Sequence, residues 1–235
     1  MRPFPLMLFA AGFGTRMGAL TAHMPKPLIA VDGQPLIDRA LALAEAANVD
    51  RIVVNLHYLG QQIIDHLQGR SVQFSWERDV ILETGGGLRA AVPLLGNGPV
   101  FTLNTDAVWT NQSALIQLLH AWDDRKMDAL VLLLPADLTT GHGGSGDFLL
   151  AEDGKVSRAR GKAGLVYLGA QIIRTDLLAH VTAQAFSLNL IWDQMIGLGR
   201  AYGVVYNGGW CDVGSPAGIA RATEMLSAAA DDVDV

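Results

Sequence analysis

The stretch from residue 8 to residue 28 reads LFAAGFGTRMGALTAHMPKPL and combines a glycine loop with two cations. An apolar run enters a loop that holds Gly12 and Gly14. Loops of this kind present backbone N–H groups to phosphate oxygens. Arg16 stands inside the loop, and Lys26 follows between two prolines that restrict its backbone. An arginine in such a loop can bind two phosphate oxygens at once, so the stretch predicts a site for a phosphorylated ligand.

Two familiar cofactor-binding patterns begin in a similar way, and this loop departs from both. The dinucleotide-binding pattern includes an acidic residue at the end of the second strand. Here Asp32 stands in a turn ahead of a helix, and the strand-like run RIVVNLH (51–57) ends without an acid. The Walker A pattern fails because Met17 occupies the position of its second glycine. Arg16 favours phosphoryl or nucleotidyl transfer over hydride transfer, because in those reactions negative charge shifts toward the leaving pyrophosphate.

Two aspartates follow strand-like runs in distant parts of the chain. Asp106 ends the run VFTLNTD (100–106), and Asp212 lies in NGGWCDVGSP (207–216) between a strand and a helix. Turn or capping roles explain such residues too, and for Asp212 that explanation stays open. Carboxylates are the ligands that a hard divalent cation prefers. Two of them at strand ends therefore predict a metal site.

The segment LETGGGLR (82–89) begins a helical stretch with an acid, a threonine and three glycines. Glycines let a ligand approach the backbone, and Thr84 is placed to cap the helix. A plain helix-start turn explains the same residues equally well, so the segment by itself leaves both interpretations open.

Strand-like and helix-like segments alternate along most of the chain. Apolar runs of strand length lie at 5–10, 51–56, 72–76, 100–104, 128–134 and 202–206, and helical periodicity lies at 35–47, 60–68, 86–95, 111–122 and 215–229. This alternation predicts an α/β fold in three layers, α/β/α, with a Rossmann-like, mostly parallel mixed sheet covered on both faces. Such sheets bind ligands at the carboxyl ends of their strands.

The glycine-rich segment 139–174 has a different character, with short β-like pieces around a turn at 152–155. We expect it to be a small β insertion that lies over the main sheet within a single domain, 1–229. Residues 230–235 are expected to form an acidic, frayed tail.

Composition limits the setting of the protein. Apolar residues make up 50% and charged residues 17%, which is typical of a stable globule. The net charge is -6 with no basic stripe, so a nucleic-acid partner is not expected. The one cysteine, Cys211, excludes an intramolecular disulfide and a cysteine-based zinc site. With neither a secretory signal nor an apolar segment of about 18 residues, we expect a cytoplasmic protein without a membrane partner.

The stretch AAGFGTRMGALTAHMPKPL (10–28) closely resembles the signature of the sugar-1-phosphate nucleotidylyltransferases, and the resemblance continues over roughly 5–220. Members of this family join a nucleoside triphosphate to a sugar 1-phosphate and release pyrophosphate. The resemblance implies the nucleotide-diphospho-sugar transferase type of fold, Arg16 and Lys26 as catalytic residues, and Mg²⁺ bound by Asp106 and Asp212. The nucleotide-binding residues that it implies are Ala11, Gly12, Gly14, Thr15, Glu83, Thr84, Gly85 and Asn104. The chain departs from the family at Thr105, where glycine is usual.

The segments 146–156 and 167–174 correspond to the sugar-binding flank of the family. The resemblance implies sugar contacts from Gly146, Asp147, Gly169 and Asn189, although a core position explains Asn189 too. Many members carry a Glu-Lys-Pro triplet here, and this chain does not. Its Gly-Asp-Phe…Asp-Gly-x-Val pattern is similar to the short branch that contains N-acetylmuramate-1-phosphate uridylyltransferases.

Several functions remain open within this resemblance. UTP and an amino-sugar 1-phosphate are favoured as substrates, and guanylyl transfer to mannose 1-phosphate or cytidylyl transfer to a phospho-alcohol are the alternatives. An alternative from another class of function is a catalytically weak sensor of sugar nucleotides, in which Thr105 is the substitution that reduces activity. Retention of Arg16, Lys26 and both aspartates argues against a sensor, which would not need contacts to a leaving group. A monomer or a homodimer is expected.

Overall fold

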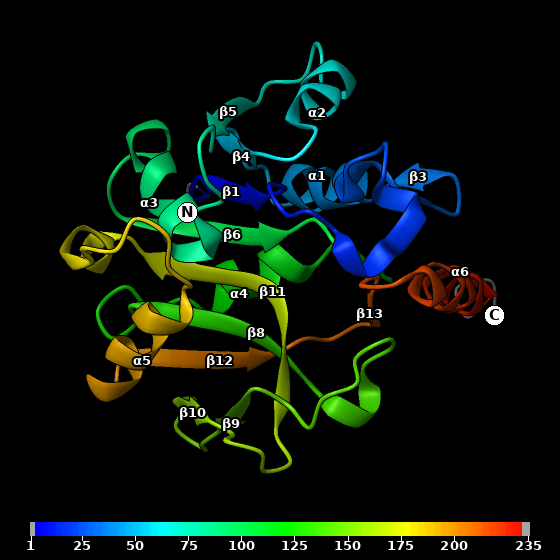
Figure 1. Ribbon diagram of the computed structural model, residues 1–235. Helices are drawn as coiled ribbons and strands as arrows, with labels where there is room; N and C mark the ends of the chain where they lie inside the picture. The colour runs from blue at the N-terminus through cyan, green and yellow to red at the C-terminus, as the bar shows by residue number, and fades with distance from the viewer. Residues whose placement is uncertain (1–2, 232–235) are drawn as a thin grey trace.

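A mixed sheet of nine strands forms the centre of the computed structural model, which describes residues 3–231 (Figure 1). The strand order is β10-β9-β11-β6-β1-β4-β5, and β8 pairs with both β11 and β12. Two further pairs, β2–β3 and β7–β13, form small separate sheets. The strands are β1 (Leu6–Phe9), β2 (Ala30–Val31), β3 (Gln34–Pro35), β4 (Ile52–Leu56), β5 (Gln73–Trp76), β6 (Pro99–Asn104), β7 (Ala107–Trp109), β8 (Ala129–Pro135), β9 (Phe148–Leu150), β10 (Val156–Arg158), β11 (Leu165–Arg174), β12 (Ala201–Val205) and β13 (Trp210–Asp212).

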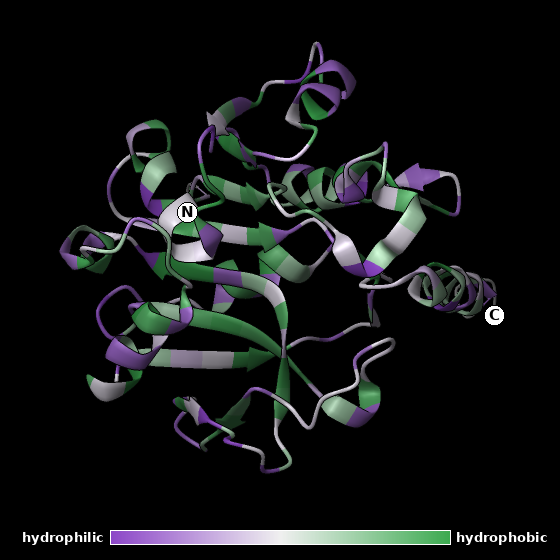
Figure 2. Cartoon of the chain, viewed as in Figure 1, coloured by the Kyte–Doolittle hydropathy of each residue, from purple (hydrophilic) through white to green (hydrophobic). Residues whose placement is uncertain are grey.

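The parallel part of the sheet is made of the strands that the apolar runs predicted. β1 pairs in parallel with both β4 and β6, and β4 pairs in parallel with β5. Every residue of β4 is buried, as expected where helices cover both faces of a sheet. Figure 2 shows this part of the sheet as mostly hydrophobic.

Helices cover the sheet from both sides. Along β1, Leu6 and Leu8 belong to the core shared with α1 and α4, whereas Met7 points into the core shared with α3 and α5. This alternation is the period of two of a strand. The predicted three-layer α/β/α architecture is thereby confirmed. The helices are α1 (Leu36–Ala46), α2 (Gly60–His66), α3 (Glu83–Leu95), α4 (Ala114–Ala121), α5 (Asn189–Gly197) and α6 (Pro216–Asp231), with 3₁₀ turns η1 (Thr15–Thr21), η2 (Lys26–Leu28), η3 (Ala136–Leu138) and η4 (Asp176–His180).

The predicted position of the 139–174 segment needs correction. Its last part, β11, does not lie over the sheet but belongs to it, antiparallel to β6 on one side and to β8 on the other. Only β9 and β10 form an edge hairpin beside it. The pairing of β11 with β8 shifts between Tyr167 and Gln171, around Gly169 with φ of 81°. The β-bulge at this glycine interrupts the local strand pattern, which is why the sequence reads as short pieces.

The C-terminal helix α6 packs on a small core of its own rather than on the main sheet. That core includes Met17, Val31 and Cys211, so α6 rests against η1, β2 and β13. The helix continues to Asp231, so residues 230 and 231 are helical where a frayed tail was expected. The rest of that tail, 232–235, lies outside the described residues. No helix within 3–231 is long and apolar enough to cross a bilayer.

Candidate active site

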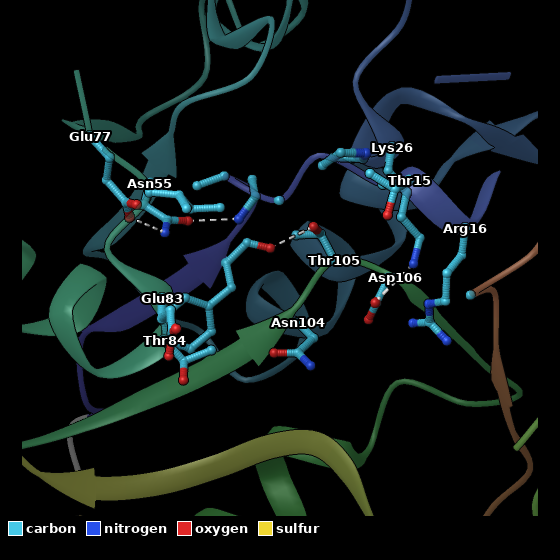
Figure 3. Close-up of a pocket in the computed structure, with 18 residues that line it drawn as sticks. Thr15, Arg16, Lys26, Asn55, Glu77, Glu83, Thr84, Asn104, Thr105 and Asp106 are labelled. Carbon is cyan, nitrogen blue, oxygen red and sulfur yellow. Dashed lines mark hydrogen bonds and ion pairs between the residues drawn. The ribbon is translucent and has the colours of Figure 1, made fainter. Parts of the chain in front are cut away.

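A cavity of about 310 Å³ opens where β1, β4, β5 and β6 end, beside the start of α3 (Figure 3). This is the carboxyl edge of the parallel strands, where α/β sheets bind ligands. Its volume falls in the range of small-molecule sites. The lining residues are Phe9, Ala10, Ala11, Gly12, Gly14, Thr15, Arg16, Lys26, Pro27, Asn55, Glu77, Ile81, Glu83, Thr84, Asn104, Thr105, Asp106 and Gly214. In Figure 3 Glu77 and Asn55 lie at one end of the cavity, and Arg16 and Asp106 lie at the other.

The glycine loop forms one wall of the cavity and depends on Gly14. This residue has φ of 64°, and a Cβ atom there would come within 2.9 Å of Thr21 Cγ2 and 3.0 Å of Lys26 Cβ. The Thr21 hydroxyl in turn donates a hydrogen bond of 3.0 Å to the Gly14 carbonyl. Only glycine therefore lets the loop close onto the stem of Lys26. Nothing lies within 4 Å of a would-be Cβ of Gly12, so the backbone there is open to a ligand.

Charged side chains gather at the Asp106 end of the cavity. Lys26 is buried, and its Nζ atom lies 2.9 Å from Asp106 Oδ2. Arg16 Nη1 lies 3.9 Å from Asp212 Oδ2, with 70% of the Arg16 side chain exposed. The two cations that the sequence singled out thus come together with the two acids. Their roles in binding and catalysis stay predictions.

The small β7–β13 sheet brings the two aspartates side by side. Asp212 pairs with Ala107, and the Val213 N–H donates a hydrogen bond of 2.9 Å to the Asp106 carbonyl. Burial and then the Asp106 carboxylate raise the pKa of Asp212, while Lys26 opposes that shift. Two close carboxylates that repel each other are stabilised by a shared cation.

The donor set at Asp106 and Asp212 fits Mg²⁺ bound jointly with a substrate. Within 3–231, no group of three or more acidic, histidine or cysteine side chains is arranged to hold a metal ion. Mg²⁺ usually takes one or two carboxylates and completes its shell with substrate phosphates and water. Asp106 and Asp212 provide that number of hard oxygen ligands beside the cations Arg16 and Lys26.

The opposite end of the cavity is built from residues that the sequence analysis missed. Asn55 accepts a hydrogen bond of 2.7 Å from the Ala10 N–H, and its amide donates one of 2.6 Å to Glu77 Oε1. The other oxygen, Oε2, accepts a hydrogen bond of 2.7 Å from the Leu82 N–H. Glu77 is 2% exposed, and the carboxylate is held by these N–H donors. The signal was a polar Asn55 inside a strand that is otherwise apolar and buried.

The Glu83–Gly85 segment divides between the cavity and the protein interior. Glu83 starts α3 with φ of 59°, an uncommon backbone conformation for a residue with a Cβ atom, and lines the cavity. Thr84 does not cap the helix as expected, because its Oγ1 accepts a hydrogen bond of 2.9 Å from the Leu188 N–H. Gly85 does not line the cavity, and its N–H donates to the Phe186 carbonyl. The glycines here let the chain before α5 lie directly on α3.

The four predicted sugar-binding residues lie outside the cavity lining. Of these four residues, Gly169 contacts the lining, since a Cβ atom there would come within 2.9 Å of the Cβ atom of Asn104. The Asp147 carboxylate accepts a hydrogen bond of 2.8 Å from the Tyr167 N–H and so holds β11. Asn189 donates to the Ser187 hydroxyl. Gly146, with φ of 110°, packs against the backbone of the chain before β11.

Thr105 fits its position without strain. Its hydroxyl donates a hydrogen bond of 2.7 Å to the Phe9 carbonyl, which joins the ends of β6 and β1. The residue is buried, and its φ is not positive. A glycine is therefore not required by the backbone at this point.

The carboxyl edge of this α/β sheet thus carries a glycine loop, two neighbouring carboxylates and two cations, and the comparisons with known proteins assign it to a class of nucleotidyltransferases. The model of the MobA-like NTP transferase domain matches residues 6–142, more than half of the chain. The chain belongs to this family.

Two relatives match nearly the whole chain. It is 38% identical to the N-acetylmuramate alpha-1-phosphate uridylyltransferase of Caulobacter vibrioides, over 95% of this chain and 97% of the relative. It is 32% identical to the protein of the same name from Neisseria meningitidis serogroup B, over 94% and 98%. The crystal structure of HddC from Yersinia pseudotuberculosis complexed with GMP-PN superposes with a TM-score of 0.74 at 21% identity, covering 94% of this chain and 98% of HddC. That likeness supports the fold.

Proposed function

We propose that this enzyme transfers a uridylyl group from UTP to N-acetylmuramate 1-phosphate, with Mg²⁺, and releases pyrophosphate. The observation that supports this chemistry is that Arg16, Lys26 and Asp106 line one end of the cavity, with Asp212 beside Arg16. The choice of substrates rests on the two full-length relatives with that activity.

The reaction is an in-line displacement at the α-phosphorus. An oxygen of the sugar phosphate forms a bond to that phosphorus while the bond to the bridging oxygen of pyrophosphate breaks. No general base is needed, because a phosphate monoester with a second pKa of about 6 is mostly dianionic at neutral pH. The rate then depends on positioning and on neutralisation of charge.

Each charged residue takes one part of that neutralisation. The exposed Arg16 guanidinium reaches from the glycine loop to bind the β- and γ-phosphates that leave together. The Lys26 ammonium leaves Asp106 to contact the attacking phosphate or the α-phosphate. Mg²⁺ held by Asp106 and Asp212 would supply positive charge at the α-phosphate. The backbone around Ala11 and Gly12, with Glu83, Thr84 and Asn104, lines the room for the nucleoside.

Pyrophosphate release measured for four nucleoside triphosphates against a panel of sugar 1-phosphates tests this proposal. The expected result is the highest kcat/KM for UTP with N-acetylmuramate 1-phosphate, and none without a divalent cation. Preference for GTP with mannose 1-phosphate would replace the proposed substrates. No turnover with any pair, together with tight binding of a sugar nucleotide, would favour the sensor.

The sensor has little support in the cavity itself. Thr105 was its expected lesion, and the residue is seated by a good hydrogen bond to Phe9. We further propose that the chain acts as one catalytic domain in the cytoplasm, as a monomer or a homodimer.

A further inference from the structure

The loop between η3 and β9 is fixed against the Asp212 strand. The Thr140 N–H donates a hydrogen bond of 3.0 Å to the Trp210 carbonyl, and the Thr140 carbonyl accepts one of 2.9 Å from the Asp212 N–H. The next residue, Gly141, has φ of 80°, and a Cβ atom there would lie 2.5 Å from the Asp212 carbonyl oxygen. Glycine is therefore required for the loop to run along Asp212. This geometry fixes the position of the residue that follows, His142.

The His142 side chain carries a buried nitrogen atom that has no partner. Two buried side-chain nitrogen or oxygen atoms of residues 3–231 lack a hydrogen bond, and one is His142 Nε2. The ring lies against Gly144, where a Cβ atom would come within 2.6 Å of Nε2. A buried polar atom without a partner costs free energy, so each such atom in a native fold needs a reason.

The surroundings of His142 indicate an anionic partner. His142 follows directly after Gly141, which lies against the Asp212 backbone, and Thr140 pairs with that strand through two hydrogen bonds. The loop therefore holds the imidazole close to the Asp212 strand. His142 does not form a metal cluster with Asp106 and Asp212, because no three such side chains of residues 3–231 are arranged to hold an ion. A phosphate oxygen of a substrate is an acceptor that an imidazole N–H close to these carboxylates would bind.

The direction of the loop indicates which phosphate that is. Arg16 approaches Asp212 from the glycine loop, which is the side of the triphosphate. The His142 loop pairs with the Asp212 strand at Thr140 and continues into Gly146 and Asp147, the predicted sugar flank. A group on this loop lies between the metal carboxylates and the sugar. The phosphate of the sugar 1-phosphate must occupy that place in order to attack.

We propose that His142 binds the phosphate of the sugar 1-phosphate, donating an imidazole N–H to it when that substrate enters. The inference rests on the proposed class of reaction, and not on the identity of the base or the sugar.

Steady-state kinetics of His142→Ala and His142→Gln, with the substrate pair that the wild-type enzyme turns over fastest, test the proposal. Loss of one hydrogen bond to an anion should raise the KM of the sugar 1-phosphate roughly tenfold in His142→Ala, with the KM of the nucleoside triphosphate unchanged. His142→Gln keeps an N–H donor and should recover part of the loss. The matched control is His120→Ala. It should change neither KM, because His120 is exposed on α4 and does not line the cavity.

The reverse reaction and a direct binding measurement separate the other roles. In pyrophosphorolysis the KM of pyrophosphate should stay the same in His142→Ala, and a rise there would assign the residue to the leaving group and overturn the proposal. A weaker affinity of the free variant for Mn²⁺, followed by electron paramagnetic resonance, would make it a metal residue and overturn it too. If His142→Ala changes kcat and every KM to the same extent and also lowers the melting temperature, the role is purely structural and the proposal is overturned.

Failure of the proposed substrates would not affect this test. If another pair is turned over, the same kinetics apply to that pair. If no pair is turned over, calorimetric titration of N-acetylmuramate 1-phosphate and mannose 1-phosphate into wild type and His142→Ala gives the answer. Equal affinities in the two proteins, or no detectable binding to wild type, would overturn the role of His142.

Discussion

Removing the charge of Lys26 should strengthen the binding of a divalent cation to the free protein while it removes most of the turnover. Lys26 Nζ lies 2.9 Å from Asp106 Oδ2, so the ammonium occupies one face of a carboxylate that is expected to bind the metal. The two cations compete for Asp106 until a nucleotide brings phosphate oxygens for Lys26. Lys26→Gln takes away the competitor and also a contact to the substrate.

The size of the competition follows from Coulomb's law. A metal–oxygen distance of about 2.1 Å places the ion within about 5 Å of the Lys26 ammonium. With the dielectric constant of bulk water, a divalent and a monovalent charge at about 5 Å repel each other by about 1.7 kcal/mol. Since the Lys26 side chain is only 11% exposed, the value for water gives the lower limit of this repulsion. We therefore expect metal affinity to rise by about tenfold or more in Lys26→Gln, while turnover falls by about 10²–10³.

Titration of Mn²⁺ followed by electron paramagnetic resonance, without nucleotide, measures this affinity directly. Lys26→Arg keeps the charge and should bind Mn²⁺ as wild type does. The double variant Lys26→Gln with Asp106→Asn should lose the gain in Mn²⁺ affinity that Lys26→Gln shows by itself. A Lys26→Gln protein that binds Mn²⁺ no more tightly than wild type would refute the reasoning, because Lys26 would then not compete for Asp106.

Three further predictions test other parts of the site. In Gly214→Ala the new Cβ atom lies 2.7 Å from Asp212 Oδ2 and 2.8 Å from Arg16 Nη1, so turnover should fall about tenfold with an unchanged melting temperature; full activity would mean that this guanidinium is not needed where it lies. Thr105→Val removes the part-buried hydrogen bond to the Phe9 carbonyl and should lower the free energy of unfolding by about 1 kcal/mol in urea titrations, with most of the turnover retained; loss of activity alone would contradict a structural role. Burial and the neighbouring carboxylate raise the pKa of Cys211 to about 11 from 9.0, so the native thiol should stay unreactive to iodoacetamide at pH 9 and react fast in denaturant. Because the unfolded thiol ionises at lower pH than the folded one, the free energy of unfolding should also fall as pH rises from about 9 toward 11; an increase over that interval would refute the assigned environment.

The parallel strands of the sheet can be predicted from the sequence, because each is recognised by the residues of its own segment. Continuous apolar runs such as 51–56 and 100–104 are buried on both faces, and nothing distant is needed to recognise them. β11 shows the limit of such reasoning. Its partners β6 and β8 are separated from it in sequence, and the bulge at Gly169 interrupts its pattern, so its place in the sheet is decided by pairing alone.

The residues of the site also fall into those that the local sequence predicts and those that it does not. Arg16 and Lys26 lie within one short signature, and the sequence alone singles them out. Asn55 and Glu77 are 22 residues apart, and neither has a spacing or a neighbour that predicts their hydrogen bond. Local sequence also gives no sign of the buried, unpaired nitrogen of His142, which depends on a loop fixed by another strand.

The end of the cavity at Asn55 and Glu77 is packed so tightly that its residues constrain one another. A Cβ atom on Gly87 would lie 2.7 Å from Glu77 Oε1 and 3.1 Å from Asn55 Nδ2, so three elements hold one another by close contact. A single substitution there disturbs its neighbours as well, and its effect on specificity is inseparable from its effect on the fold. At the charged end Arg16 has 70% of its side chain exposed, so a substitution there affects the fold far less than one at Gly87 does. Change at the packed end would therefore require coordinated replacement of several residues, whereas the exposed Glu83 at the rim can vary by itself.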